Sequence, residues 1–148
     1  MRSPRLHAAK FRTFSGAVAV LLTAAIIGCG NSGPTLYPVV GKVTIDGQPA
    51  KEGGVVFHDE SNRMRQFVGG ISPDGNYKIM HNREQGAPPG KYRVTVFVTE
   101  TPMDASGNPT NLPRTLSNQK FMDANNTPLA VEITDSAPSG SYDLTVTR

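Results

Sequence analysis

The chain has 148 residues with 15 glycines, 12 prolines and no tryptophan, a composition that is unfavourable for a helical bundle. Its formal net charge is +3 at pH 7, and its single cysteine excludes an intramolecular disulfide. A chain of this length can bury one hydrophobic core, which excludes an arrangement of several ordinary domains.

The N-terminal segment has the pattern of an export signal. Residues 1–13 carry four basic side chains and no acidic one, and residues 14–28 are an uncharged, largely apolar run. Fifteen residues are fewer than the roughly 20 that a helix needs to span a bilayer. We therefore expect residues 1–28 to be a cleaved signal peptide.

The apolar run ends in Ile26-Ile27-Gly28-Cys29, which resembles the lipobox of bacterial lipoproteins. The resemblance implies cleavage between Gly28 and Cys29, and attachment of diacylglycerol and a fatty acid such as palmitate to Cys29. The membrane then becomes a partner through the lipid. The location is the cell envelope, on the inner or outer membrane, facing the periplasm or the cell surface. The alternative is an uncleaved membrane anchor in which Cys29 is an ordinary buried cysteine.

Loss of residues 1–28 changes the charge of the protein. Removing the four basic residues of this segment leaves 11 of the 15, against 12 acidic residues, so the mature chain has a formal charge of −1. Binding to nucleic acid needs clustered Lys and Arg. We therefore expect no nucleic-acid partner.

After a short lipidated tether, residues 29–37, the sequence predicts one β domain over residues 38–148. Asp46-Gly47 and Asp74-Gly75 are typical turn pairs between strands. The β-rich runs are Val39–Ile45, Val55–Phe57, Gln66–Ile71, Asn76–Met80, Lys91–Thr99, Leu129–Thr134 and Tyr142–Thr147.

Apolar and polar residues alternate in the clearest of these runs. One apolar face per strand is typical of antiparallel sheets with one wet side, hence of a sandwich or a barrel. Thr95, Phe97 and Thr145 are expected to point outward, and Phe97 is then the main exposed aromatic residue of the central strands. The predicted inward residues are Val43, Ile45, Val55, Phe57, Tyr77, Ile79, Val94, Val96, Val131, Ile133, Leu144 and Val146.

Residues 100–128 lack this alternation and are rich in Pro, Asn, Thr and Ser. A connection of this length is uncommon, so we expect a short strand or turn near residues 120–122. Binding groups concentrate on scaffold loops, and we place any function here. The alternative is a plain crossover pinned by Phe121, in which case the sheet face around Phe97 becomes the place to search.

Five turn and strand motifs follow one another along the chain: Gly41-Lys42-Val43, Asp46-Gly47-Gln48-Pro49, Gly54-Val55-Val56-Phe57, Asp74-Gly75-Asn76-Tyr77-Lys78-Ile79 and Pro89-Gly90-Lys91-Tyr92-Arg93-Val94. They resemble the carboxypeptidase regulatory-like, or transthyretin-like, domain, and more narrowly the small lipoproteins of the Planctomycetes that carry it. The later Leu112-Pro113, Lys120-Phe121 and Thr127-Pro128-Leu129 also resemble the C-terminal half of those lipoproteins. The resemblance covers residues 37–148. It implies an all-β, prealbumin-like Greek-key antiparallel sandwich of about seven strands that acts as a non-catalytic module.

Residues that carry chemistry are sparse. No serine lies in a Gly-x-Ser-x-Gly context, so the sequence predicts no enzyme. His58-Asp59-Glu60 is a weak candidate for a cation contact, with solvated strand-end residues as the alternative. Asp74-Gly75-Asn76 offers two oxygens to Ca²⁺, but a hairpin turn accounts for it equally. We expect no metal and no cofactor.

The sequence thus predicts a non-catalytic, lipid-anchored cell-envelope β-sandwich with a structural or protein-binding role. Its expected partner is an envelope protein or a polysaccharide. The alternative is a lipoprotein that binds a carbohydrate or another small ligand through residues 100–128.

Overall fold

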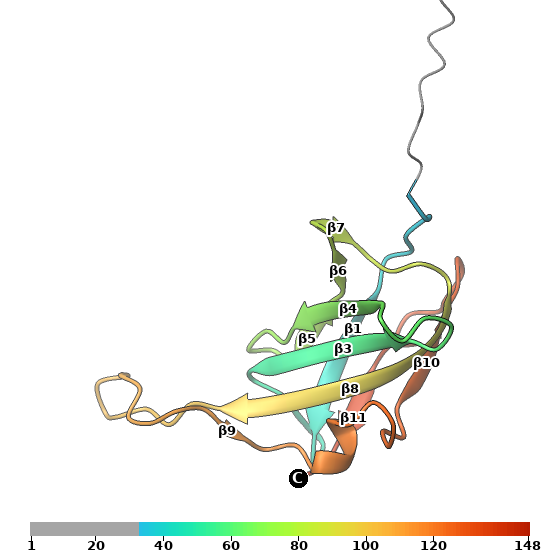
Figure 1. Cartoon of the computed structure of the whole chain (residues 1–148). Coiled ribbons are helices and arrows are strands. Elements are labelled where there is room, and N and C mark those ends of the chain that lie inside the picture. The colour runs from blue at the N-terminus through green and yellow to red at the C-terminus, as the bar shows by residue number, and fades with distance from the viewer. Residues whose placement is uncertain (1–32) are drawn as a thin grey trace, which may run out of the picture. The chain divides into compact units, whose positions relative to one another are not determined.

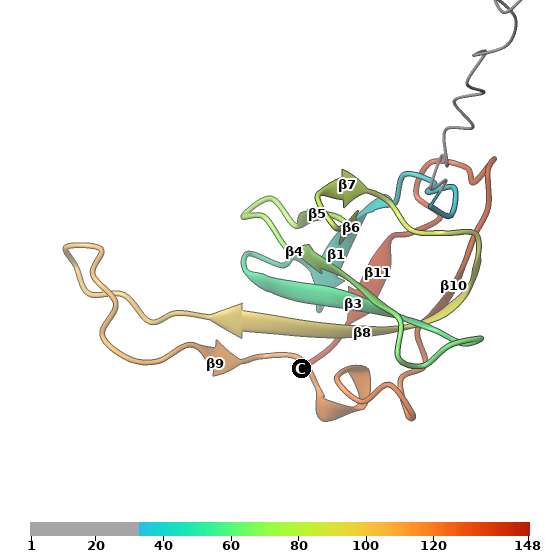
Figure 2. The same ribbon diagram turned by 45° about the horizontal axis from the view of Figure 1, so that its top comes forward.

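The computed structural model describes residues 33–148. The expected signal peptide, the Gly28–Cys29 junction and the first residues of the tether lie outside the described residues. The described chain folds into two β-sheets that pack face to face (Figures 1 and 2). The expected all-β sandwich is confirmed. No helix within residues 33–148 has the length and apolarity to cross a membrane.

The smaller sheet has the strand order β11-β1-β2, with β5 also paired to β1. The first and last strands are neighbours, because Val43 of β1 lies beside Leu144 of β11 in a parallel ladder. The other ladders of the described chain are antiparallel. The bounds are β1 Val40–Ile45, β2 Gln48–Pro49, β5 Asn76–Lys78 and β11 Leu144–Val146.

The larger sheet has the order β10-β8-β3-β4-β6-β7, with β9 also paired to β8. The chain changes sheets at Ile79, because β5 before it pairs with β1 whereas β6 after it pairs with β4. The bounds are β3 Gly53–Asp59, β4 Gln66–Gly70, β6 Met80–His81, β7 Glu84–Gln85, β8 Gly90–Glu100, β9 Arg114–Thr115 and β10 Ala130–Ile133.

The core lies between the two sheets, and the predicted register holds. Eleven of the twelve predicted inward residues are buried. Val131 is only partly buried against the core, because β10 is the edge strand of its sheet. Phe67, Tyr92 and Tyr142 add large side chains to the same cluster.

On the outward face of the larger sheet, Thr95 is less exposed to solvent than its position in the strand suggested. Thr95 does point away from the core, but it is buried, because the His58 ring lies over it with Nε2 2.9 Å from Oγ1 of Thr95. The predicted outward orientation of Thr95 is correct, but a neighbouring side chain shields it from solvent. Thr145 is exposed, as predicted.

The stretch 100–128 is more ordered than a plain connection. The expected turn near residues 120–122 is confirmed as a 3₁₀ turn, Gln119–Phe121, with Phe121 buried. On either side of it, hydroxyl groups bond to the part of β8 that lies between its pairings with β10 and with β9. Ser117 Oγ accepts from the Val98 N–H at 3.1 Å, and Thr127 Oγ1 donates to the Val94 carbonyl at 2.7 Å.

Candidate functional site

A polar pocket with a volume of about 430 Å³ opens at the end of the larger sheet. We call it the arginine pocket. Its walls are the β3–β4 loop, residues 59–65, and the turn at residues 123–127. His58, Gln66 and Arg93 reach it from β3, β4 and β8. The lining residues are His58, Asp59, Glu60, Arg63, Gln66, Arg93, Ala124 and Asn125.

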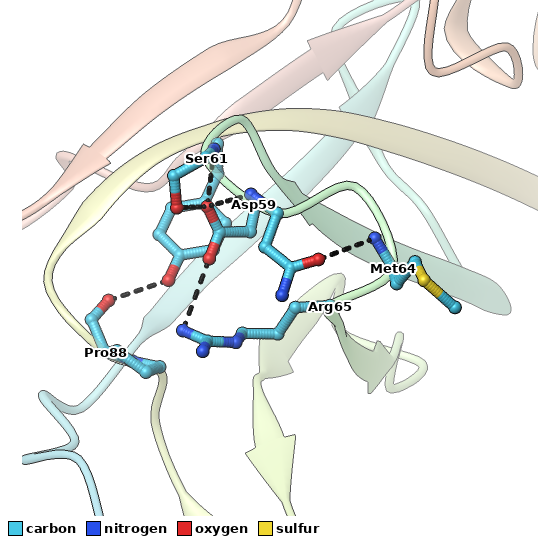
Figure 3. A network of polar contacts seen from close by, with 7 residues as sticks. Asp59, Ser61, Met64, Arg65 and Pro88 are labelled. Carbon is cyan, nitrogen blue, oxygen red and sulfur yellow. Dashed lines mark hydrogen bonds and ion pairs between the residues drawn. The ribbon is translucent and has the colours of Figure 1, made fainter.

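The carboxylate of Asp59 holds the β3–β4 loop in place (Figure 3). Its Oδ1 accepts hydrogen bonds from the Ser61 hydroxyl at 2.6 Å and the Ser61 N–H at 2.8 Å. Its Oδ2 pairs with Arg65 at 3.5 Å. Burial raises the pKa of Asp59, but these hydrogen bonds outweigh burial and leave that pKa below its ordinary value. Asp59 is therefore an ionised structural anchor, and its charge is already satisfied.

Tyr92 of β8 is buried and is the strand partner of Asp59. Its hydroxyl donates to the Pro88 carbonyl at 2.9 Å. Burial, with a further contribution from the Asp59 carboxylate, raises the pKa of Tyr92 to about 12. The hydroxyl stays protonated at neutral pH and serves as a structural donor.

Two arginines reach the turn at residues 123–127 from different elements. Arg93 Nη1 donates to the Thr127 carbonyl at 3.2 Å, and Arg63 Nη1 contacts Oδ1 of Asn125 at 3.5 Å. Glu60 lies 3.6 Å from Arg93 Nε in a solvent-accessible ion pair. The two guanidinium groups are thereby brought to one pocket, and each retains N–H donors beyond these contacts.

His58 forms part of the pocket beside Arg93. Partial burial lowers the pKa of His58, so its ring is neutral at pH 7. One ring nitrogen is engaged with Thr95. Within the described residues, no three His, Cys, Asp or Glu side chains are grouped so as to hold a metal ion.

A wider, more open groove of about 1060 Å³ lies along β1 and β5. The segment 134–143 forms its other wall, and Lys42, Lys78, Asp135 and Asp143 contribute charges of both signs. The Asp143 carboxylate already accepts a hydrogen bond from the Lys42 main-chain N–H at 2.8 Å. This groove has no concentration of one charge or one chemistry.

A hairpin-shaped arm, residues 101–113, continues from β8 and β9 and extends away from both sheets (Figures 1 and 2), with one isolated bridge between Met103 and Pro109. At its base Arg114 Nε donates to the Glu100 carboxylate at 2.9 Å. At its tip the Asp104 carboxylate accepts from the N–H groups of Ser106 and Asn108, both at 2.8 Å. The arm is thus internally bonded at both ends.

The arm exposes apolar side chains that nothing in the described chain covers. Leu112 is 87% exposed and Met103 is 56% exposed.

Phe97 of β8, the aromatic residue singled out in the sequence, is 42% exposed. A side-chain carbon on Gly54 would lie 2.4 Å from the Phe97 ring, so the ring rests on the glycine backbone.

The other candidates from the sequence are accounted for locally. Asp74 closes the β4–β5 turn, where its carboxylate accepts from the Ser72 hydroxyl at 2.6 Å and from the Asn76 N–H at 3.2 Å. These hydrogen bonds lower the pKa of Asp74, and the bond from Ser72 makes the largest contribution. His81 packs against the Phe67 ring with their centroids 4.9 Å apart.

The sequence reasoning missed Arg63 and Arg93. They are 30 positions apart and no motif contains both, so only the fold brings them together. Residues 100–128 contribute Ala124 and Asn125 to the pocket and also the whole of the arm. Comparisons of the chain with protein-family models, with curated proteins and with solved structures find no match.

Proposed function

We propose that the mature protein is a non-catalytic, lipid-anchored module that binds another envelope protein through the arm. The observation that carries the proposal is the exposure of Leu112 and Met103 on an arm whose base and tip are internally bonded. Uncovered apolar side chains on an ordered projection are typical of interaction sites. An arm that is already ordered loses little conformational entropy on binding.

The anchor rests on the sequence around Cys29. A basic segment, an apolar run and Ile26-Ile27-Gly28-Cys29 together support cleavage and lipidation in the cell envelope. The two-sheet fold supports the likeness to transthyretin-like, carboxypeptidase regulatory-like domains. In this proposal the lipid holds the sandwich at the inner or outer membrane, and the arm faces the periplasm or the cell surface.

Labelling with radioactive palmitate tests the anchor. The wild-type chain, expressed in a bacterium, should take up the label, and the Cys29→Ala variant should not. One acyl chain binds a membrane only marginally, whereas two hold it firmly, so the variant should also leave the membrane fraction if its signal is still cleaved. Failure of the wild-type chain to take up label would disprove the lipoprotein assignment.

Photo-crosslinking in cells tests the arm. A photoreactive amino acid at position 112 should give one discrete adduct with another envelope protein. The same amino acid at Val40, which is 54% exposed on β1, is the matched control and should not give that adduct. Deletion of residues 103–111 should abolish the adduct from position 112. An adduct of twice the mass of the chain, or none at all, would contradict binding to a different protein.

A further inference from the structure

The arginine pocket is independent of the arm, and its charges are arranged unevenly. Of its two acidic side chains, Asp59 is buried and bonded to Ser61 and Arg65. Glu60 is the remaining acid and pairs with Arg93, and the lining contains a second guanidinium group, that of Arg63. The accessible part of the pocket therefore has an excess of one positive charge and a surplus of N–H donors.

Arg93 is held in the pocket before any ligand arrives. Arg93 is fixed by the Thr127 carbonyl, and Arg63 contacts Asn125 on the same turn. Asp59 in turn holds the loop that carries Arg63. Planar guanidinium groups match a carboxylate, and prior fixation reduces the entropy lost on binding.

The remaining lining favours a ligand with hydroxyl groups. Gln66, Asn125 and His58 each provide polar atoms that pair with hydroxyls, and Glu60 adds an acceptor. A volume of about 430 Å³ lies within the roughly 300–1,000 Å³ typical of small-molecule sites. We propose that the arginine pocket binds a sugar acid, with its carboxylate on Arg63 and Arg93 and its hydroxyls on the amide and imidazole side chains.

Titration of the full chain, extracted from membranes in a non-ionic detergent, tests this assignment. D-Galacturonate is the probe, and D-galactose and inorganic phosphate are the comparison ligands. We expect saturable binding of galacturonate, followed by NMR at the His58 and Asn125 resonances, that weakens as salt is added. Galactose lacks the carboxylate and phosphate lacks the sugar hydroxyls, so each should bind at least about tenfold more weakly.

Charge variants make the test specific. Arg63→Gln and Arg93→Gln should each weaken galacturonate binding by about tenfold or more, because each removes a charge-assisted hydrogen bond. Glu60→Gln should strengthen it severalfold, because the carboxylate that competes for Arg93 is gone. Arg83→Gln, in the exposed β6–β7 turn, makes the same change of charge away from the pocket lining and should have no effect.

Several results would overturn the inference. Binding of galactose or phosphate as tightly as galacturonate would show that the pocket does not recognise the carboxylate and the hydroxyls of one ligand. Unaltered galacturonate binding in Arg63→Gln would show that Arg63 does not hold the carboxylate. This exposed loop residue can be replaced without disturbing the core. Absence of galacturonate binding to the wild-type chain would reject the site, whatever the arm binds.

Discussion

The Tyr77 hydroxyl donates a hydrogen bond to the main-chain oxygen of Tyr142 at 2.5 Å, across 65 positions of sequence. The bond ties β5 to the segment that leads into β11. Burial raises the pKa of Tyr77 well above its ordinary value, and the nearby Asp143 carboxylate and Tyr142 make smaller contributions in the same direction. Tyr77 therefore remains a donor at any physiological pH. The hydroxyl of Tyr142 is itself buried and has no partner in the described chain.

Replacing each tyrosine by phenylalanine should give opposite results. Tyr77→Phe leaves the buried carbonyl of Tyr142 unpaired and should lower the free energy of unfolding by about 1–3 kcal/mol. Tyr142→Phe removes a hydroxyl without a partner and should leave stability unchanged or raise it. Urea denaturation of both variants measures the difference. Equal losses would show that the Tyr77 bond is not what stabilises this junction.

The same junction explains why residue 41 is glycine. A side-chain carbon at this position would lie 2.3 Å from the main-chain oxygen of Tyr142. Gly41→Ala should therefore destabilise the protein by about 1–3 kcal/mol, as overpacking does. Gly70→Ala is the control, because nothing lies within 4 Å of its added carbon. The control should be neutral or slightly stabilising in thermal unfolding, and similar losses in both variants would refute the explanation.

Side-chain hydroxyls take the place of ladder hydrogen bonds along the part of β8 between its pairings with β10 and with β9. Thr127→Val keeps the shape of the side chain but removes the donor to the Val94 carbonyl. Leaving that buried group unpaired should lower the free energy of unfolding by about 1–3 kcal/mol. Thr145→Val is the control, because Thr145 is exposed and bonds only to the Thr44 hydroxyl at the surface. If chemical denaturation shows no difference between them, the Thr127 hydroxyl is dispensable.

Asp59 should make stability depend on acid pH. Its pKa in the folded protein lies below the ordinary value of 3.8. Its contribution is therefore complete above that ordinary value and is lost as the pH falls through the folded pKa. Asp59→Asn should lower the free energy of unfolding by about 1–2 kcal/mol at pH 7.

The measurement is urea denaturation of the wild type and Asp59→Asn from pH 7 to pH 2. The difference between them should shrink below about pH 4, as Asp59 becomes protonated in the wild type. Asp135→Asn, at an exposed carboxylate in the 134–143 segment, should follow the wild type throughout. A difference that stays constant down to pH 2 would show that the charge of Asp59 does not hold the loop.

The alternation of residues allowed most of the fold to be predicted. Every β-rich run in the sequence overlaps an observed strand, and eleven predicted core residues are buried. The errors lie where the alternation of inward and outward residues along a strand does not decide how much of a side chain is exposed to solvent. Thr95 has the predicted orientation, yet His58 from the neighbouring strand covers it. Val131 has the right parity, yet an edge strand buries it only partly.

The sequence alone determined which face of each strand is apolar and where the chain turns, because these are patterns among near neighbours. The export signal and the lipidation of Cys29 stay predictions from the same kind of local pattern. The tertiary structure decided which strands pair, including the parallel β1–β11 ladder and the change of sheet at Ile79. It also decided that Arg63, Arg93 and Asn125 meet at one pocket. Contacts of this kind depend on the path of the chain between residues that are distant in sequence, and local alternation carries no information about that path.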